Sequence, residues 1–227
     1  MVSIIQQRTS RRSPARVHVN ADELTGYPDG ASRQRSPVFP FPFRAMHEAN
    51  ERCLELLVNA ARSTSAPPFS LVVALRALLR DSSPALRSRA AKRCCLLLDM
   101  EFSEPLWWRA VTNRPEISPR VGRSAEGFPR RSATPLARAT LALAREAVHA
   151  DFDAARVILG MHRDVAAIIR SLQHSDIERI CDRQFRRLRP RWMDQPAIWR
   201  SLLLSARMEQ PTLCRDFDLH ALRLLVS

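Results

Sequence analysis

Six arginines between residues 179 and 191 are the side chains whose type and spacing point most directly to chemistry. Four of them recur at helical spacing, on the face of a predicted helix opposite Ile180 and Phe185, and two follow just beyond that helix. The six are Arg179, Arg183, Arg186, Arg187, Arg189 and Arg191. Guanidinium groups clustered in this way suit contacts to phosphate, which position a protein on nucleic acid. The alternative is a solvated helix face in an arginine-rich chain.

A helix–glycine–helix pattern lies before these arginines. Apolar spacing predicts a short helix over residues 154–158, capped by Asp151 or Asp153. Gly160 ends this helix, because glycine accepts the positive φ of a tight turn. A second helix follows, with apolar residues at Val165, Ile168, Ile169 and Leu172. This order is typical of a helix-turn-helix, in which the second helix offers one face to a DNA groove. That face would carry His162, Arg163, Ala167 and Arg170.

No set of acids, bases and nucleophiles in the sequence suggests an active site. The six histidines are scattered, and Asp151 and Asp153 are better explained as helix caps. We therefore do not expect an enzyme. A role as a pH switch stays open for His162 or His174, against the simpler interpretation of an exposed or hydrogen-bonded histidine.

The cysteines are expected to be reduced and buried rather than paired or bound to metal. There are five of them, at no metal-ligand spacing: Cys53, Cys94, Cys95, Cys181 and Cys214. We expect no metal and no cofactor, and the cytoplasm as the compartment.

The composition indicates an all-α fold. Ala, Leu and Arg, which are good helix formers, dominate the 227 residues, while a single Tyr and no alternating runs of Val, Ile and Thr leave little from which to build strands. The formal charge of +13 suggests an anionic partner, although Lys92 is the only lysine and a codon bias toward Arg and Ala would give the same excess. No run approaches the roughly 20 apolar residues that a membrane span requires, so we expect no membrane partner.

Changes in composition along the chain predict two small helical bundles joined by a linker. We expect a disordered tail over residues 1–45, a helical bundle over 46–110, a basic Pro/Arg/Ser linker over 111–133 and a helical domain over 134–227. The segment from Met1 to Asn20 is basic but lacks the apolar run of a secretory signal. A secretion signal of the disordered kind stays open for the tail from Met1 to Arg16.

Several helix starts are recognisable. Ser83-Pro84 and Thr134-Pro135 each combine a capping residue with a proline at the first helical position, and Ser175 to Glu178 form a predicted capping box. The pair Trp107-Trp108 would close the core of the first bundle or present an anchor for a partner.

Residues 140 to 192, and above all Leu141 to Leu172, resemble the family of the flagellar transcriptional regulator FlhD. Four motifs carry the resemblance, in the same order and at the same intervals as in the family. They are Leu141-Ala-Leu-Ala-Arg145, Asp151-Phe-Asp-Ala-Ala155, Ile158-Leu-Gly-Met161 and the helix from Ala166 to Leu172. Residues 1 to 130 show no such likeness.

The resemblance implies a helical, dimerising subunit. FlhD acts with a zinc-binding partner, FlhC, which supplies much of the DNA affinity, and the complex activates flagellar operons through RNA polymerase. The cysteine that links FlhD protomers falls at Leu188 here, so the resemblance implies no intersubunit disulfide. Arg191 lies where the family's Phe-Arg-Phe is replaced by Pro190-Arg-Trp192.

Two hypotheses follow from the sequence. The first is an FlhD-like transcriptional activator of flagellar or secretion genes, which binds DNA as a dimer or with an FlhC-like partner subunit. Its contacts would come from the corner at Gly160 and from the arginines between Arg179 and Arg191. The second is a helical adaptor without DNA affinity, whose partner would bind Trp107-Trp108 and the leucine-rich helix faces.

Overall fold

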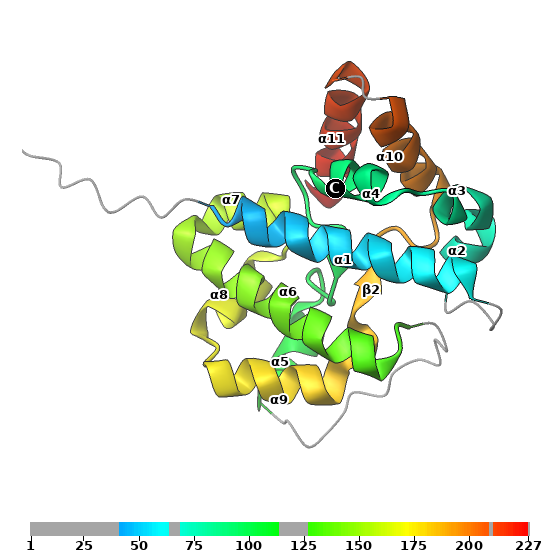
Figure 1. Cartoon of the computed structure of the whole chain (residues 1–227). Coiled ribbons are helices and arrows are strands. Elements are labelled where there is room, and N and C mark those ends of the chain that lie inside the picture. The colour runs from blue at the N-terminus through cyan, green and yellow to red at the C-terminus, as the bar shows by residue number, and fades with distance from the viewer. Residues whose placement is uncertain (1–40, 64–68, 114–126, 209–210, 227) are drawn as a thin grey trace, which may run out of the picture. The chain divides into compact units, whose positions relative to one another are not determined.

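The computed structural model describes residues 41–63, 69–113, 127–208 and 211–226, and about three quarters of them lie in helices (Figure 1). The predicted tail, apart from residues 41–45, and most of the predicted linker lie outside these described residues. The prediction of an all-α fold is confirmed.

Six elements lie in the described residues before residue 114. They are α1 Phe43–Arg62, α2 Ser70–Ala74, α3 Arg76–Arg80, α4 Pro84–Ala91, β1 Leu98–Asp99 and α5 Pro105–Asn113. The part after residue 126 begins with the longest helix of the described chain. Its elements are α6 Arg130–Ala150, α7 Phe152–Ile158, α8 Arg163–Ser171, α9 His174–Gln184, the 3-10 turn η1 Phe185–Arg187, β2 Arg189–Pro190, α10 Pro196–Met208 and α11 Pro211–Val226.

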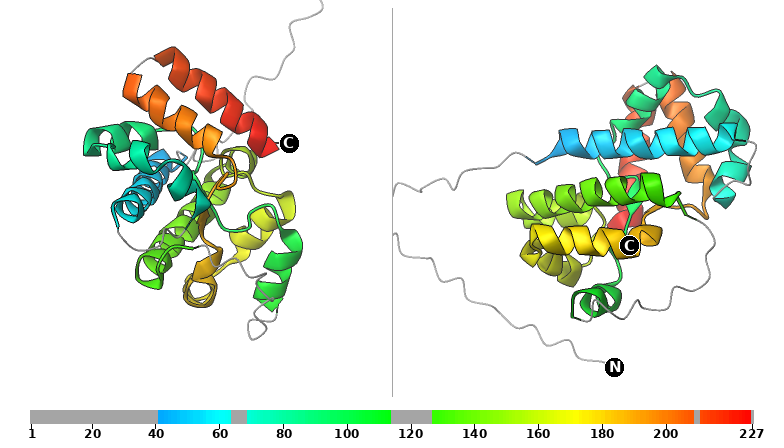
Figure 2. Two further views of the ribbon diagram at one scale, coloured as in Figure 1. Left: turned by 90° about the vertical axis from the view of Figure 1, so that its right-hand side faces the viewer. Right: turned by 60° about the horizontal axis from the view of Figure 1, so that its bottom comes forward.

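The two predicted helical bundles share one hydrophobic core, and residues 38–227 form one compact unit. Helix α1 packs against α3 and α4 on one side and against α6 on the other, while α6 also packs against α7, α8 and α9 (Figures 1 and 2). Helix α10 lies between α4 and α11. The buried face of α1 is wide: it covers about half of the helix circumference and consists of Met46, Ala49, Asn50, Cys53, Leu54, Leu57, Val58 and Ala61. A face of that width requires partners on two sides, so the predicted division between 46–110 and 134–227 does not separate two cores.

A two-residue antiparallel pairing also joins the two parts of the chain. Leu98 lies opposite Pro190, and Asp99 lies opposite Arg189. This pairing fixes the segment after Leu98 against the segment after η1, and both segments carry charged side chains.

Two predicted helix starts are confirmed by their caps. The Ser83 hydroxyl accepts a hydrogen bond from the Leu86 N–H at 3.2 Å, and the Asp151 carboxylate accepts one from the Ala154 N–H at 2.9 Å. Both bonds satisfy N–H groups that lack a partner inside the helix.

Two other predicted starts were wrong by a few residues. Helix α6 begins at Arg130, after Pro129, so Pro135 lies inside it. Phe128 and Ala133, which precede Pro135, are buried, and their packing favours a helix that begins before Pro135. The capping box of α9 pairs Gln173 with Asp176, whose carboxylate accepts from the Gln173 N–H at 3.0 Å, and the predicted Ser175–Glu178 box lies within the helix.

Both tryptophans of the pair at 107 and 108 are buried. The indole N–H of Trp108 donates to the carbonyl of Glu101 at 2.9 Å, and the Trp107 ring meets Trp108 edge to face at a centroid distance of 5.1 Å. The predicted closing of the core is confirmed, and neither ring lies free to anchor a partner. Among the described residues no helix is both long enough and apolar enough to cross a membrane.

The buried side chain of Asn50 provides a test of the shared core. Its amide donates to the carbonyls of Ala91 and Cys95 at 3.1 and 3.0 Å and accepts from the Leu97 N–H at 2.7 Å. We expect Asn50→Leu, which keeps the branched shape of the side chain but removes all three bonds, to lower the free energy of unfolding by about 2–4 kcal/mol. Urea unfolding followed by circular dichroism measures this change.

The matched control is Asn59→Leu, because Asn59 is exposed on the same helix. That variant is expected to stay within about 0.5 kcal/mol of the wild type. Equal stability of the two variants would show that Asn50 does not hold α1 against the segment from residue 91 to residue 97.

Candidate nucleic-acid interface

Gly160 forms the turn between α7 and α8, as predicted. Its φ is +55°, in the left-handed region that favours glycine. The Met161 N–H donates to the Arg156 carbonyl at 2.8 Å, which closes the end of α7, and the His162 N–H donates to the Phe102 carbonyl at 2.9 Å. The corner is therefore bonded both to α7 and to the segment after β1.

His162 caps α8. Its Nδ1 accepts a hydrogen bond from the Asp164 N–H at 3.1 Å, which gives the exposed imidazole a structural role at the helix start. Asp164 in turn pairs with Arg109 of α5. The proposed pH-switch role for His162 or His174 stays a prediction.

Helix α8 has the two faces that the sequence predicted. Val165, Ala166 and Ile169 are buried against the core, while Ile168 is half-buried. The opposite face is exposed and carries His162, Arg163, Ala167 and Arg170. Since Asp164 is the only acidic residue of this helix and is paired with Arg109, the exposed face is basic.

The predicted cationic stripe of α9 is partly neutralised within the protein. Arg179 pairs with Asp176 at 2.7 Å, and Asp182 pairs with Arg138 of α6 at 2.8 Å. Arg183 and Arg186 are exposed. The stripe is therefore less basic than the sequence suggested.

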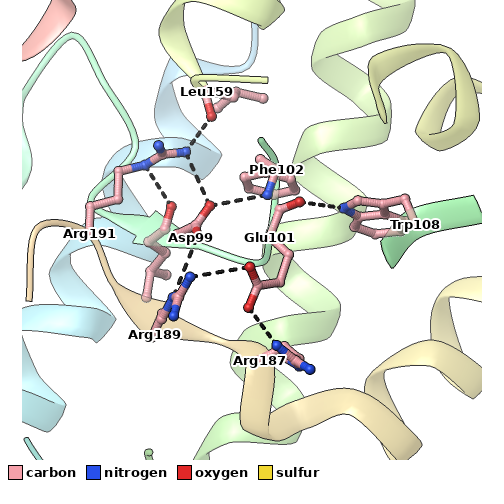
Figure 3. Close-up of polar contacts among 9 residues, drawn as sticks. Asp99, Glu101, Phe102, Trp108, Leu159, Arg187, Arg189 and Arg191 are labelled. Atoms are coloured by element: carbon pink, nitrogen blue, oxygen red, sulfur yellow. Dashed lines mark hydrogen bonds and ion pairs between the residues drawn. The ribbon is translucent and has the colours of Figure 1, made fainter. Parts of the chain in front are cut away.

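Arg187 and Arg189 are directed toward the side chain of Glu101 (Figure 3). The Glu101 carboxylate is only 8% exposed and accepts from Arg187 Nη1 at 2.9 Å and from Arg189 Nη2 at 3.2 Å. Arg189 Nε also lies 3.6 Å from a carboxylate oxygen of Asp99. Two of the six predicted phosphate-binding arginines are thus held by carboxylates of the chain itself.

Arg191 is buried and braces the Gly160 corner (Figure 3). Its Nε donates to the Leu98 carbonyl at 2.9 Å, and its Nη2 donates to the Leu159 carbonyl. Nη2 also lies 4.0 Å from the Asp99 carboxylate. Burial lowers the pKa of Arg191, and the charge of Asp99 opposes this shift. Its predicted role as a DNA contact does not fit its position, because its guanidinium lies inside the protein.

We call Asp99, Glu101, Arg187, Arg189 and Arg191 the carboxylate–arginine network. Its acidic members were not predicted from the sequence. Glu101 and Arg187 are 86 residues apart in the chain, and no short motif links them. Only the β1–β2 pairing brings them together.

Nothing in the described residues forms a metal site: no group of three or more His, Cys, Asp or Glu side chains among them could hold an ion. The chain matches no protein-family model, no curated protein and no solved structure. The resemblance to FlhD therefore stays a prediction from the residues quoted above.

The crowding at Gly160 predicts a specific loss of stability. A Cβ at this position would lie 2.7 Å from both Arg191 Nη1 and Leu225 Cδ2. Because Arg191 is held by its other bonds and the positive φ costs an alanine about 1–2 kcal/mol, we expect Gly160→Ala to lower the free energy of unfolding by about 2 kcal/mol or more. Chemical denaturation measures the effect.

Gly127→Ala is the control, since a Cβ at Gly127 would meet nothing within 4 Å. This variant is expected to be as stable as the wild type, within about 0.5 kcal/mol. If Gly160→Ala were equally harmless, Arg191 would not be packed tightly against the corner.

Proposed function

We propose that this chain is an FlhD-like transcriptional regulator that contacts DNA through the exposed face of α8. The observation that carries the proposal is the combination of a glycine corner with a second helix that buries Val165, Ala166 and Ile169 and exposes a basic face. This arrangement is the one in which helix-turn-helix proteins present side chains to the major groove.

The dimensions of α8 suit this role. An α-helix with its side chains is about 10–12 Å wide, close to the roughly 12 Å width of the major groove. Arg163 and Arg170 are seven residues apart on one face, which places them about 10 Å apart along the helix axis. They would reach bases about three pairs apart, and arginine is the side chain that most often reads guanine.

In this proposal the chain acts in the cytoplasm and raises the transcription of flagellar or secretion genes. It does so as a dimer or with an FlhC-like partner subunit, as the resemblance implies. The exposed apolar side chains of α10 are available for such a contact, since Leu204 and Met208 are 41% and 57% exposed.

The adaptor is the second candidate, and a groove between α10 and α11 favours it. The groove has a volume of about 670 Å³, and its apolar lining includes Leu204, Met208 and Phe217. An adaptor would bind a protein partner through this groove instead of through the buried tryptophans, and it would need no affinity for DNA.

We expect replacement of Arg163 and Arg170 by serine to weaken binding to a duplex from the chain's own upstream region. A good arginine–base contact contributes about 1–3 kcal/mol of discrimination, so preference over a random duplex should fall by roughly tenfold or more. An electrophoretic mobility assay on both duplexes measures this.

The charge-matched control is Arg207→Ser with Arg215→Ser, because both side chains are exposed and lie on α10 and α11. This control variant should keep the preference for the upstream duplex over a random duplex. The proposal fails if the wild-type chain, alone or with a co-encoded partner, shows no salt-sensitive binding, and that outcome favours the adaptor.

A further inference from the structure

A cluster of basic and aromatic side chains lies where α6 begins and α9 ends. The guanidinium carbon of Arg130 lies 5.4 Å from the centroid of the Phe185 ring, and that of Arg186 lies 5.8 Å from the same centroid. Arg131 is exposed in the same first turn of α6. We call Arg130, Arg131, Phe185 and Arg186 the arginine–phenylalanine cluster.

The positive charge of this cluster is not neutralised by the described part of the chain. Within residues 41–63, 69–113, 127–208 and 211–226, no acidic side chain forms an ion pair with Arg130, Arg131 or Arg186, and the first turn of α6 contains no acidic residue. The start of a 21-residue helix adds its own positive partial charge. Two guanidinium groups on one ring repel each other, and an anion placed between them would remove that repulsion.

A continuous surface along α6 and α9 leads from this cluster to α8. Helices α6 and α9 lie side by side (Figures 1 and 2). At the α8 end, His149 of α6 is hydrogen-bonded to the Arg170 carbonyl at 3.1 Å, and His149 and His174 line one open cavity of about 740 Å³. Further along, Arg138 bridges to Asp182 of α9. The cluster follows at the end of α9.

The length of α9 and η1 sets the distance between the two basic sites. Eleven α-helical residues and three 3-10 residues extend about 22 Å. In a DNA duplex this length corresponds to about six to seven base pairs, because successive pairs are about 3.4 Å apart. A polyanion such as a DNA duplex spans this length, whereas a single free phosphate does not.

We propose that Arg130, Arg131 and Arg186 hold the DNA phosphate backbone about half a helical turn from the bases that α8 contacts. This inference rests on the proposed function and assigns a different role to each of the two basic sites. The α8 face reads sequence, and the arginine–phenylalanine cluster supplies sequence-independent affinity. Of the other predicted phosphate contacts, Arg187, Arg189 and Arg191 lie in the carboxylate–arginine network, and Arg179 lies in an ion pair with Asp176.

The test compares salt dependence with sequence preference. Binding of a fluorescent duplex from the upstream region is followed by anisotropy between about 50 and 200 mM salt, for the wild type and for a variant with Arg130→Ser, Arg131→Ser and Arg186→Ser. Each phosphate contact contributes about 0.9 to the slope of log K against log salt concentration, so the slope should fall by about 2 to 3. The preference for this duplex over a random one should stay unchanged.

The control carries Arg76→Ser, Arg207→Ser and Arg215→Ser, which remove the same charge from exposed sites on α3, α10 and α11. Its slope should match that of the wild type. Circular dichroism checks that both variants fold. If the cluster variant does not fold, Arg131→Ser alone is used, because the guanidinium groups over the Phe185 ring are those of Arg130 and Arg186. Loss of Arg131 should lower the slope by about 1.

The possible failures are distinguishable. A wild-type chain without salt-sensitive DNA binding overturns both the proposed function and this inference. A wild-type chain that binds, with a cluster variant whose slope is unchanged, overturns only the inference. The inference alone is also overturned if the cluster variant keeps its slope but loses binding to vesicles that contain phosphatidylserine. The cluster would then bind a membrane surface.

Discussion

The fold around the Gly160 corner depends on the pairing of two carboxylates with three arginines. Asp99 lies in β1 and Glu101 lies two residues after it, and their arginine partners lie in or beside β2. Removing one member of a buried pair leaves the other charge uncompensated, which typically costs about 3–5 kcal/mol. Arg191 extends this network to the Leu159 carbonyl, so the same charges that join the two parts of the chain also hold the turn before α8.

The carboxylate–arginine network separates the arginines that bind the protein's own acids from those that face solvent. A formal charge of +13 gives no indication of which guanidinium groups face solvent. The network places Arg187, Arg189 and Arg191 against the protein's own acids, and ion pairs on α9 neutralise Arg179. Among the arginines that remain exposed, those proposed to contact DNA lie at two places: the exposed face of α8 and the arginine–phenylalanine cluster at the start of α6.

Local signals in the sequence predicted much of this structure. The caps at Ser83 and Asp151, the positive φ of Gly160 and the two faces of α8 all depend on residues within one or two helical turns, and all four are found in the structure. The start of α6 was predicted too late, because the burial of Phe128 and Ala133 favours helix before Pro135 and this packing is not visible in the local pattern. The network and the shared core could not be predicted, since each depends on contacts between residues more than 80 positions apart, or between α1 and α6.

The central claim is that DNA engages the arginines left on the surface and not those of the carboxylate–arginine network. Nuclear magnetic resonance of the arginine Nε–Hε groups, titrated with the upstream duplex, tests it most directly. We expect the resonances of five arginines to shift: Arg130, Arg131, Arg163, Arg170 and Arg186. Those of Arg187, Arg189 and Arg191 should keep their positions, since their partners are carboxylates and carbonyls inside the protein. Large shifts at these three residues, with none at Arg163 and Arg170, would contradict the account.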